Sequence, residues 1–165
     1  MSMQYTIDKY FLALARITLG WIFFWAFLDK VFGLGFTTES GKTWLDGVSP
    51  TYGFLKFASK GIFAPIHQAI AGNPVVDWLF MLGLLGIGIA LILGIGMKIA
   101  SYSGAFLSLL LWSAVVPPEH NPIVDEHIVY LFVFLALSAM HAGDYLGLGV
   151  RWSQTALVRK YPWLR

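Results

Sequence analysis

Four long apolar runs constrain the fold of this chain more than any other feature of its sequence. They cover residues 10–28, 75–97, 99–116 and 123–142. An α-helix of about 20 apolar residues crosses the hydrocarbon core of a bilayer, which is about 30 Å thick. Only 12% of the residues are charged, against about 25% in soluble domains. We therefore predict an all-α integral membrane protein of one domain, residues 1–165, built as a four-helix transmembrane bundle in a lipid bilayer.

The connections between these runs differ sharply in length. Residues 33–72 form a long connection rich in aromatic and aliphatic side chains, whereas the later runs are separated by only a few residues. Long connections with apolar content tend to act as lids. We predict that residues 33–72 form a partly helical extracytoplasmic cover over the bundle, with short helices at 50–60 and 64–71. Residues 143–165 are predicted to form a tail.

Basic residues gather at the end of the predicted bundle that holds both termini. This end carries Lys9, Lys98, Arg151, Arg159, Lys160 and Arg165. The opposite end carries four lysines together with seven acidic residues. Lys and Arg favour the cytoplasmic side of a membrane protein. We therefore predict a protein of the cytoplasmic membrane with both termini in the cytoplasm.

Several classes of function are disfavoured by what the sequence lacks. Without cysteine, a thiolate metal site, an iron–sulfur cluster and a persulfide-forming nucleophile are excluded. No nucleotide-binding fingerprint occurs, and we expect no nucleic-acid partner and no metal. A bis-histidine haem is also not expected, because His127 and His141 lie in one predicted helix, roughly 21 Å apart along its axis, which leaves only His67 or His120 as a partner for His127.

A five-residue pattern opens both the second and the fourth apolar run. Asn73-Pro-Val-Val-Asp77 recurs as Asn121-Pro-Ile-Val-Asp125. Asparagine caps helix N-termini, and an acidic residue in the first turn faces the positive end of the helix dipole. We therefore predict helix caps at Asn73 and Asn121. The repeat is too short to establish a duplication of helix pairs.

Small residues recur every four positions in two of the runs. Gly86, Ala90 and Gly94 share this spacing in the second run, and Gly104 and Ser108 share it in the third. Such spacing allows helix backbones to approach closely within lipid. We predict that both faces pack against neighbouring helices.

One face of the fourth run carries the polar groups that packing alone does not explain. At helical spacing it presents His127, Tyr130, Phe134, Ser138 and His141. We predict a functional site at the extracytoplasmic end of the bundle, with Lys30, Asp125 and His127 as the catalytic residues. In this hypothesis Lys30 holds an anion and His127 orients it or passes protons. Asp125 either caps its own helix or fixes the tautomer of the histidine.

Three further residues are candidates for binding substrate, namely Arg16, Asp77 and Glu126. Arg16 is the only charged residue in the first run, and it shares a face with Gly20 and Lys30. One interpretation is that its side chain snorkels to the lipid headgroups. The other interpretation turns it into the bundle, toward a carboxylate or a substrate.

The chain resembles the DoxX/DoxD family of small membrane proteins, which includes the small subunit of archaeal thiosulfate:quinone oxidoreductase. The resemblance extends over nearly the whole chain and rests on Ala15-Arg16, Gly20, Asp29-Lys30, Asn73-Pro74, the glycine-rich second run, and Asn121-Pro122 followed by Asp125, Glu126 and His127. It implies a four-helix membrane bundle that passes electrons from an extracytoplasmic sulfur anion to a membrane quinone, often with a second subunit.

Two functions from different classes are open at this point. The first is a membrane subunit of a sulfur-anion (thiosulfate-like) to quinone oxidoreductase, with quinone as the electron acceptor. The second is a non-catalytic subunit that anchors or stabilises a larger redox or transport complex. Both predict a second protein subunit or a homo-oligomer as a partner.

Overall fold

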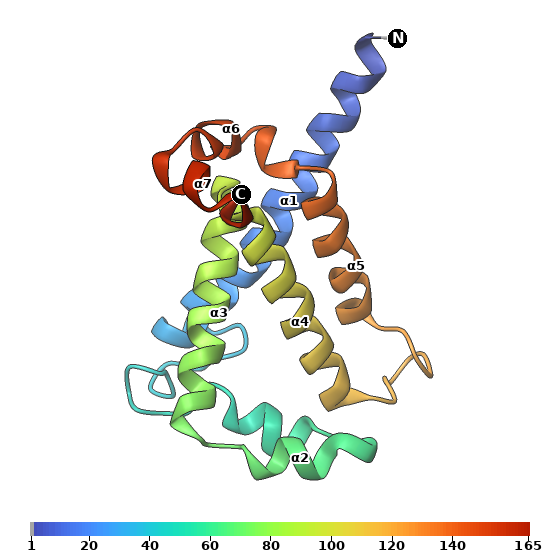
Figure 1. Cartoon of the computed structure of the whole chain (residues 1–165). Helices are drawn as coiled ribbons and strands as arrows, with labels where there is room; N and C mark the ends of the chain where they lie inside the picture. The colour runs from blue at the N-terminus through green and yellow to red at the C-terminus, as the bar shows by residue number, and fades with distance from the viewer. Residues whose placement is uncertain (1) are drawn as a thin grey trace.

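The computed structural model describes residues 2–165, with side chains from residue 7 onward, and within that range it is all-helical. Four longer helices dominate it: α1 (Ser2–Phe32), α3 (Pro74–Leu93), α4 (Met97–Val115) and α5 (Glu126–Ala139). Figure 1 shows the connection 33–72 at one end of the molecule and the segment after α5 at the other. We call these the lid end and the tail end. The N-terminal end of α1 also lies at the tail end.

Three of the four long helices meet the length and hydropathy expected of a membrane span. They are Ile7–Phe32 of α1, all of α3 and all of α4. Helix α5 has 14 residues, which corresponds to about 21 Å and is shorter than a bilayer core. These three helices indicate a membrane protein.

The helix predicted for the fourth apolar run, residues 123–142, is wrong at both ends, because α5 covers only Glu126–Ala139. Asn121 does not cap a helix, because its side chain accepts the amides of Ile123 and Val124 in a separate turn. Asp125 is the residue that caps α5. At the other end, His141 adopts a left-handed backbone with φ of 51° and lies outside the helix. His141 therefore does not share a helical face with His127, Tyr130, Phe134 and Ser138, contrary to the prediction.

Helix α3 begins as predicted and ends earlier than predicted. The side chain of Asn73 accepts the amide of Val75 at 2.9 Å and caps the helix. Gly94 ends α3 in a left-handed conformation with φ of 74°. The second run was predicted to continue to residue 97, but positive φ at Gly94 and again at Gly96 forms a corner instead.

The connection 33–72 folds mostly as turns. It holds a single π turn (Phe54–Ala58), a 3₁₀ turn (Gly61–Phe63) and α2 (Ala64–Ala69). The helix predicted at 64–71 is present but two residues shorter, whereas the one predicted at 50–60 is reduced to the π turn. The connection contacts the end of α4 through the amide of Lys60, which donates to the carbonyl of Ala114 at 2.8 Å.

The long helices pack in two pairs, α1 along α3 and α4 along α5. At the first crossing, a Cβ atom on Gly20 would lie 2.8 Å from the Cβ of Leu91, and one on Gly88 would lie 2.7 Å from the amide nitrogen of Phe24. Gly104 faces the ring of Phe134 as predicted. The prediction for Gly86 is wrong, because a Cβ atom added to it would meet no atom within 4 Å and the glycine faces open space.

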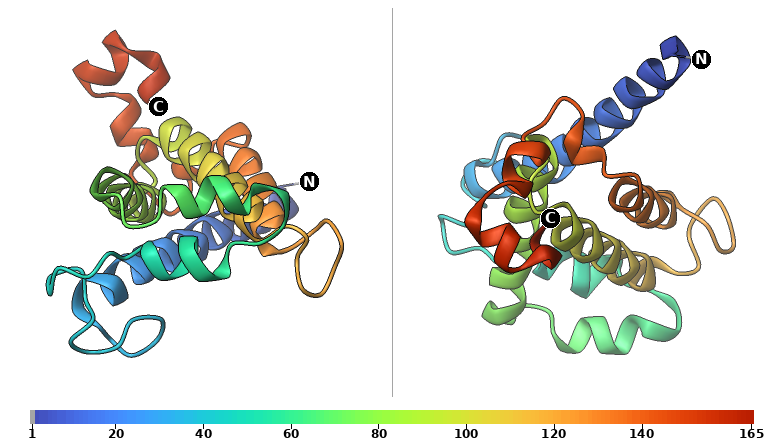
Figure 2. Two further views of the ribbon diagram at one scale, coloured as in Figure 1. Left: turned by 90° about the horizontal axis from the view of Figure 1, so that it is seen from below. Right: turned by 45° about the horizontal axis from the view of Figure 1, so that its top comes forward.

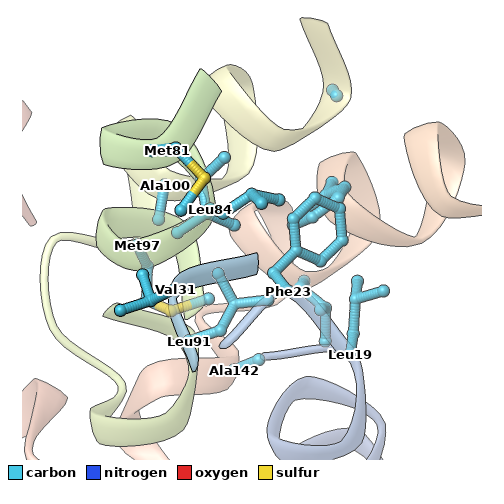
Figure 3. Close-up of a cluster of buried hydrophobic side chains, with 13 residues drawn as sticks. Leu19, Phe23, Val31, Met81, Leu84, Leu91, Met97, Ala100 and Ala142 are labelled. Atoms are coloured by element: carbon cyan, nitrogen blue, oxygen red, sulfur yellow. The ribbon is translucent and has the colours of Figure 1, made fainter. Parts of the chain in front are cut away.

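A cluster of buried hydrophobic side chains joins the α1–α3 pair of helices to the α4–α5 pair. Figure 3 shows Leu19 and Phe23 of α1 beside Leu84 and Leu91 of α3. Phe23 also meets Phe134 of α5 edge-on, with ring centroids 5.2 Å apart. Helices α1 and α5 therefore touch in the interior, which connects the α1–α3 pair to the α4–α5 pair.

The segment after α5 folds against the corner between α3 and α4. It contains η3 (Ala142–Asp144), α6 (Gly149–Ser153), α7 (Ala156–Lys160) and η4 (Pro162–Leu164). The amide of Leu148 donates to the carbonyl of Leu93, and the amide of Lys98 donates to the main-chain oxygen of Arg165. The indole of Trp152 donates to the carbonyl of Leu164 at 2.8 Å. The predicted tail is therefore an ordered cap at this end.

Candidate functional site

Asp125 uses its two carboxylate oxygens for two different purposes at the start of α5. Oδ1 accepts the backbone amides of His127 and Ile128, at 3.0 and 3.3 Å, and caps the helix. Oδ2 lies 2.8 Å from Nδ1 of the His127 ring. The sequence offered capping and tautomer control as alternatives for Asp125. The structure combines them in one side chain.

This contact defines which nitrogen of His127 is available for chemistry. A carboxylate only accepts hydrogen bonds, so Nδ1 carries the proton that it donates to Asp125. In the neutral ring Nε2 is then a proton acceptor, and it has no hydrogen-bond partner among residues 7–165. The His127 side chain is 19% exposed and that of Asp125 is 9% exposed. The pair can therefore exchange a proton with its surroundings through Nε2.

Glu126 stands beside the pair on the exposed side of the helix start. One ligand atom from each of Asp125, Glu126 and His127 lies within 4.8 Å of the others. Both oxygens of Asp125 are already hydrogen-bonded, and Nδ1 of His127 is one of their donors. The carboxylate of Glu126 and Nε2 of His127 are the two possible metal ligands that remain free, fewer than the four ligands typical of a structural zinc site. We therefore assign no metal here.

Lys30 does not join this pair. Helices α1 and α5 run antiparallel and touch where Phe23 meets Phe134. Lys30 and His127 each lie seven residues beyond that contact toward the lid end, about 10 Å along their own helices. Figure 2 shows that the helices splay, so that the end of α1 and the loop before α5 lie on opposite sides of the molecule. The predicted cluster of Lys30, Asp125 and His127 does not assemble within one chain.

Arg16 points into the protein and is fully buried. Its Nη1 donates to the carbonyls of Leu91 and Ile92 at the end of α3. Its Nη2 donates to the carbonyls of Tyr145 and Leu146, both at 3.0 Å. The prediction of an inward arginine is confirmed, and the snorkelling alternative is wrong. No carboxylate pairs with it among residues 7–165.

Asp77 is also buried, and its contacts belong to the connection 33–72. Its Oδ1 accepts the hydroxyls of Ser49 at 2.8 Å and Thr51 at 2.5 Å. This fastens the connection to the first turn of α3. The contacts of Asp77 and Arg16 join segments of the chain, and the expectation that these residues bind substrate stays a prediction.

The sequence does not predict the contacts of two polar side chains at the lid end, Asp29 and His67. Asp29, which is 1% exposed, accepts the amides of Phe36 and Thr37 and the hydroxyl of Thr37. Nε2 of His67 lies 3.0 Å from the hydroxyl of Ser113, which itself donates to the carbonyl of Leu110. The serine proton is thus already used, so the histidine donates. Asp29 follows an apolar run and precedes a threonine-containing turn, which is a recognisable signature, whereas nothing in the sequence pairs residue 67 with residue 113.

Comparison of the chain with protein-family models, curated proteins and solved structures gives no match. The proposed function therefore rests on the resemblance noted in the sequence and on the geometry of the Asp125–His127 pair.

Proposed function

We propose that this chain is a membrane subunit of a sulfur-anion to quinone oxidoreductase and that the Asp125–His127 pair handles protons in that reaction. The observation that supports the proposal is the 2.8 Å contact between Asp125 Oδ2 and His127 Nδ1, which leaves Nε2 available. In the proposed assembly α5 completes a four-helix membrane bundle with α1, α3 and α4. The lid end faces the extracytoplasmic side.

The reaction needs both an electron path and a proton path. Joining two thiosulfate dianions through a new sulfur–sulfur bond releases two electrons, and a quinone that takes up two electrons also takes up two protons. The quinone supplies the electron-accepting chemistry. His127 takes up a proton at Nε2 and passes it to the bound acceptor, while Asp125 keeps the ring oriented. Glu126, exposed at the same helix start, connects this relay to water.

The sulfur anion is held by a second subunit in this proposal. Asp125, Glu126 and the nearby Glu119 give the start of α5 a negative environment, and the last turn of α1 with Lys30 lies on the other side of the molecule. A dianion requires a locally basic pocket. A partner seated on the lid end would bring such a pocket to the pair.

The test is sulfur-anion-dependent quinone reduction by the complex purified in mild detergent. We expect His127→Ala to lower the rate at least about tenfold, or about 1.4 kcal/mol of transition-state stabilisation. His120→Ala is the matched control, since His120 is exposed in the loop before α5. Equal rates for wild type and His127→Ala would remove the pair from the mechanism. A tenfold loss with Lys30→Ala would place Lys30 back in the site.

The second candidate function is a non-catalytic anchoring subunit. It is favoured by the contacts of Arg16, Asp29 and Asp77, which are buried and hydrogen-bonded within the chain. Affinity purification in mild detergent separates the two functions. A stoichiometric partner with its own redox centre, together with full activity in His127→Ala, would support anchoring. Quinone reduction that depends on His127 would support the oxidoreductase subunit.

A further inference from the structure

Residues 49–71 of the long connection are tied to the ends of two membrane-spanning helices. Near the start of this segment, the hydroxyl of Thr51 donates to Asp77 in the first turn of α3. Further along, the amide of Lys60 donates to the carbonyl of Ala114 in the last turn of α4. Helix α3 begins and α4 ends at the lid end, where α2 lies across them (Figure 1). These contacts therefore hold the segment at the level where both spans end.

Two tryptophans mark this level as the boundary between membrane and water. Trp78 is exposed and directly follows Asp77. Trp112 directly precedes Ser113, whose hydroxyl contacts His67 of α2. Tryptophan is enriched where spanning helices leave the hydrocarbon core. The segment is thus fastened beside residues that are typical of the membrane interface.

This segment also exposes the two most accessible large hydrophobic side chains among the described residues. Ile62 is 81% exposed and Phe57 is 77% exposed. Ile66 follows Ile62 by one helical turn and is exposed as well. The π turn that contains Phe57 packs against α2, which contains Ile66. We call these three side chains the lid surface, and an apolar surface of this kind marks a contact with a membrane or a partner.

The charges of the segment favour phospholipid as that contact. Residues 47–76 contain no Asp or Glu, and their only Lys or Arg residues are Lys56 and Lys60. Both lysines are exposed, and neither forms an ion pair within residues 7–165. Acidic residues, Glu39 and Asp46, occur only in the earlier part of the connection. Lysine beside aromatic and aliphatic residues is typical of segments that lie in the membrane interface, where its stem is buried and its ammonium group reaches the phosphates.

We propose that residues 54–70 dock on the phospholipid surface of the membrane that the chain spans, with the lid surface inserted among the acyl chains. Lipid is the occupant because the segment is held at the depth where phospholipid surrounds the span ends, and because its free charges are all cationic. The lid surface contains no residue of the Asp125–His127 pair. The inference is therefore independent of the proposed function.

The test measures the depth of nitroxide labels in the membrane. The chain contains no cysteine, so Ile62→Cys and Ile66→Cys each introduce a single labelling site. The full chain is reconstituted in phosphatidylcholine vesicles without any partner. Oxygen concentrates in hydrocarbon, whereas a chelated nickel complex stays in water, and electron paramagnetic resonance reports collisions of the label with each. We expect an oxygen-to-nickel collision ratio at least about threefold higher at these positions than for Glu39→Cys, because an interfacial apolar face lies about 5–10 Å into the headgroup and acyl boundary.

Gln68→Cys provides the matched control on the same helix. Gln68 is exposed and lies about 200° around α2 from Ile66. Its label should therefore report water, as the label at residue 39 does. Phe57→Cys supplies a further position on the lid surface if one of the isoleucine variants folds poorly.

Two results would overturn the proposal. Collision ratios at Ile62 and Ile66 equal to the ratio at Glu39 would place the lid surface in water and leave it for a protein partner. Equal ratios at Ile66 and Gln68 would show that α2 is not inserted by one face.

Discussion

Two polar centres of this protein use their hydrogen-bonding groups in opposite ways. Near the tail end, Arg16 is fully buried, and four backbone carbonyls accept its hydrogen bonds. Toward the lid end, the Asp125–His127 pair is partly exposed and leaves one ring nitrogen free. A charged group whose contacts all lie within the fold joins segments together. A group with a free, accessible atom can act on something else.

Arg16→Leu tests the buried centre and should have the largest effect on stability. Hydrogen bonds to charged groups contribute about 1.5–3 kcal/mol each, and the change leaves several buried carbonyls unpaired. We expect a loss of at least about 3 kcal/mol, which for a chain of this size lowers the midpoint of thermal unfolding by roughly 6–12 °C. Tryptophan fluorescence in detergent measures it. Arg151→Leu at an exposed position is the control, and an unchanged midpoint for Arg16→Leu would show that the carbonyls find other partners.

Asp77→Ala extends the comparison to a buried acid, Asp77, whose hydrogen bonds also join two segments of the chain. It removes the hydrogen bonds from Ser49 and Thr51, for which we expect a cost of about 2 kcal/mol. The effect should be local, since these contacts hold the connection 33–72 to α3. Amide hydrogen exchange should accelerate in residues 49–60 and remain unchanged in the tail. Glu39→Ala, in an exposed pair with Lys42, should leave exchange in residues 49–60 as in wild type.

Two substitutions of Asp125 separate capping from tautomer control. Asparagine caps helices as well as aspartate, so Asp125→Asn should preserve stability to within about 0.5 kcal/mol. Its amide cannot provide two accepting oxygens, so the proton of His127 should move from Nδ1 to Nε2. Nitrogen NMR of the ring detects this move independently of any activity. Asp125→Ala should lose both properties and about 1 kcal/mol of stability. Retention of the Nδ1–H tautomer in Asp125→Asn would contradict the assignment.

The smallest expected effect is the pH dependence contributed by His67. Burial lowers the pKa of His67 below its ordinary value of 6.5. The unfolded chain therefore binds more protons than the folded one as the pH falls through about 6.5. The contribution of His67 to stability is complete above that pH and decreases below it. We expect unfolding midpoints of wild type to fall more between pH 7 and pH 5 than those of His67→Gln, and parallel curves would exclude this role.

The sequence predicts the fold wherever one local pattern determines a structure. The three long spans follow from continuous apolar residues, and the cap at Asn73 follows from its place before Pro74. The similar pattern at Asn121 does not begin a helix, because α5 is capped by Asp125, whereas α3 is capped by Asn73. Asn121 accepts the amides of Ile123 and Val124, whereas Asp125 accepts those of His127 and Ile128, and periodicity does not indicate which of the two residues begins the helix.

The site was harder to predict because it depends on how helices cross. The pairing of Asp125 with His127 is local and is one of the two roles that the sequence allows for Asp125, whereas the position of Lys30 depends on the splay between α1 and α5. The inward direction of Arg16 is one of the two interpretations that the sequence leaves open. The sequence does not indicate its acceptors, because they lie 75 to 130 residues further along the chain.

That long separation has a consequence for how the protein is made. Arg16 enters the membrane before the segment after α5 is made, and an arginine at a helix centre then costs about 2.5–3.5 kcal/mol. The carbonyl of Tyr145 is 129 residues further on, which at ribosomal speed is a delay of roughly 6–26 s. During this interval the guanidinium depends on α3, on water or on the insertion machinery. The segment after α5 thus completes the hydrogen bonding of α1.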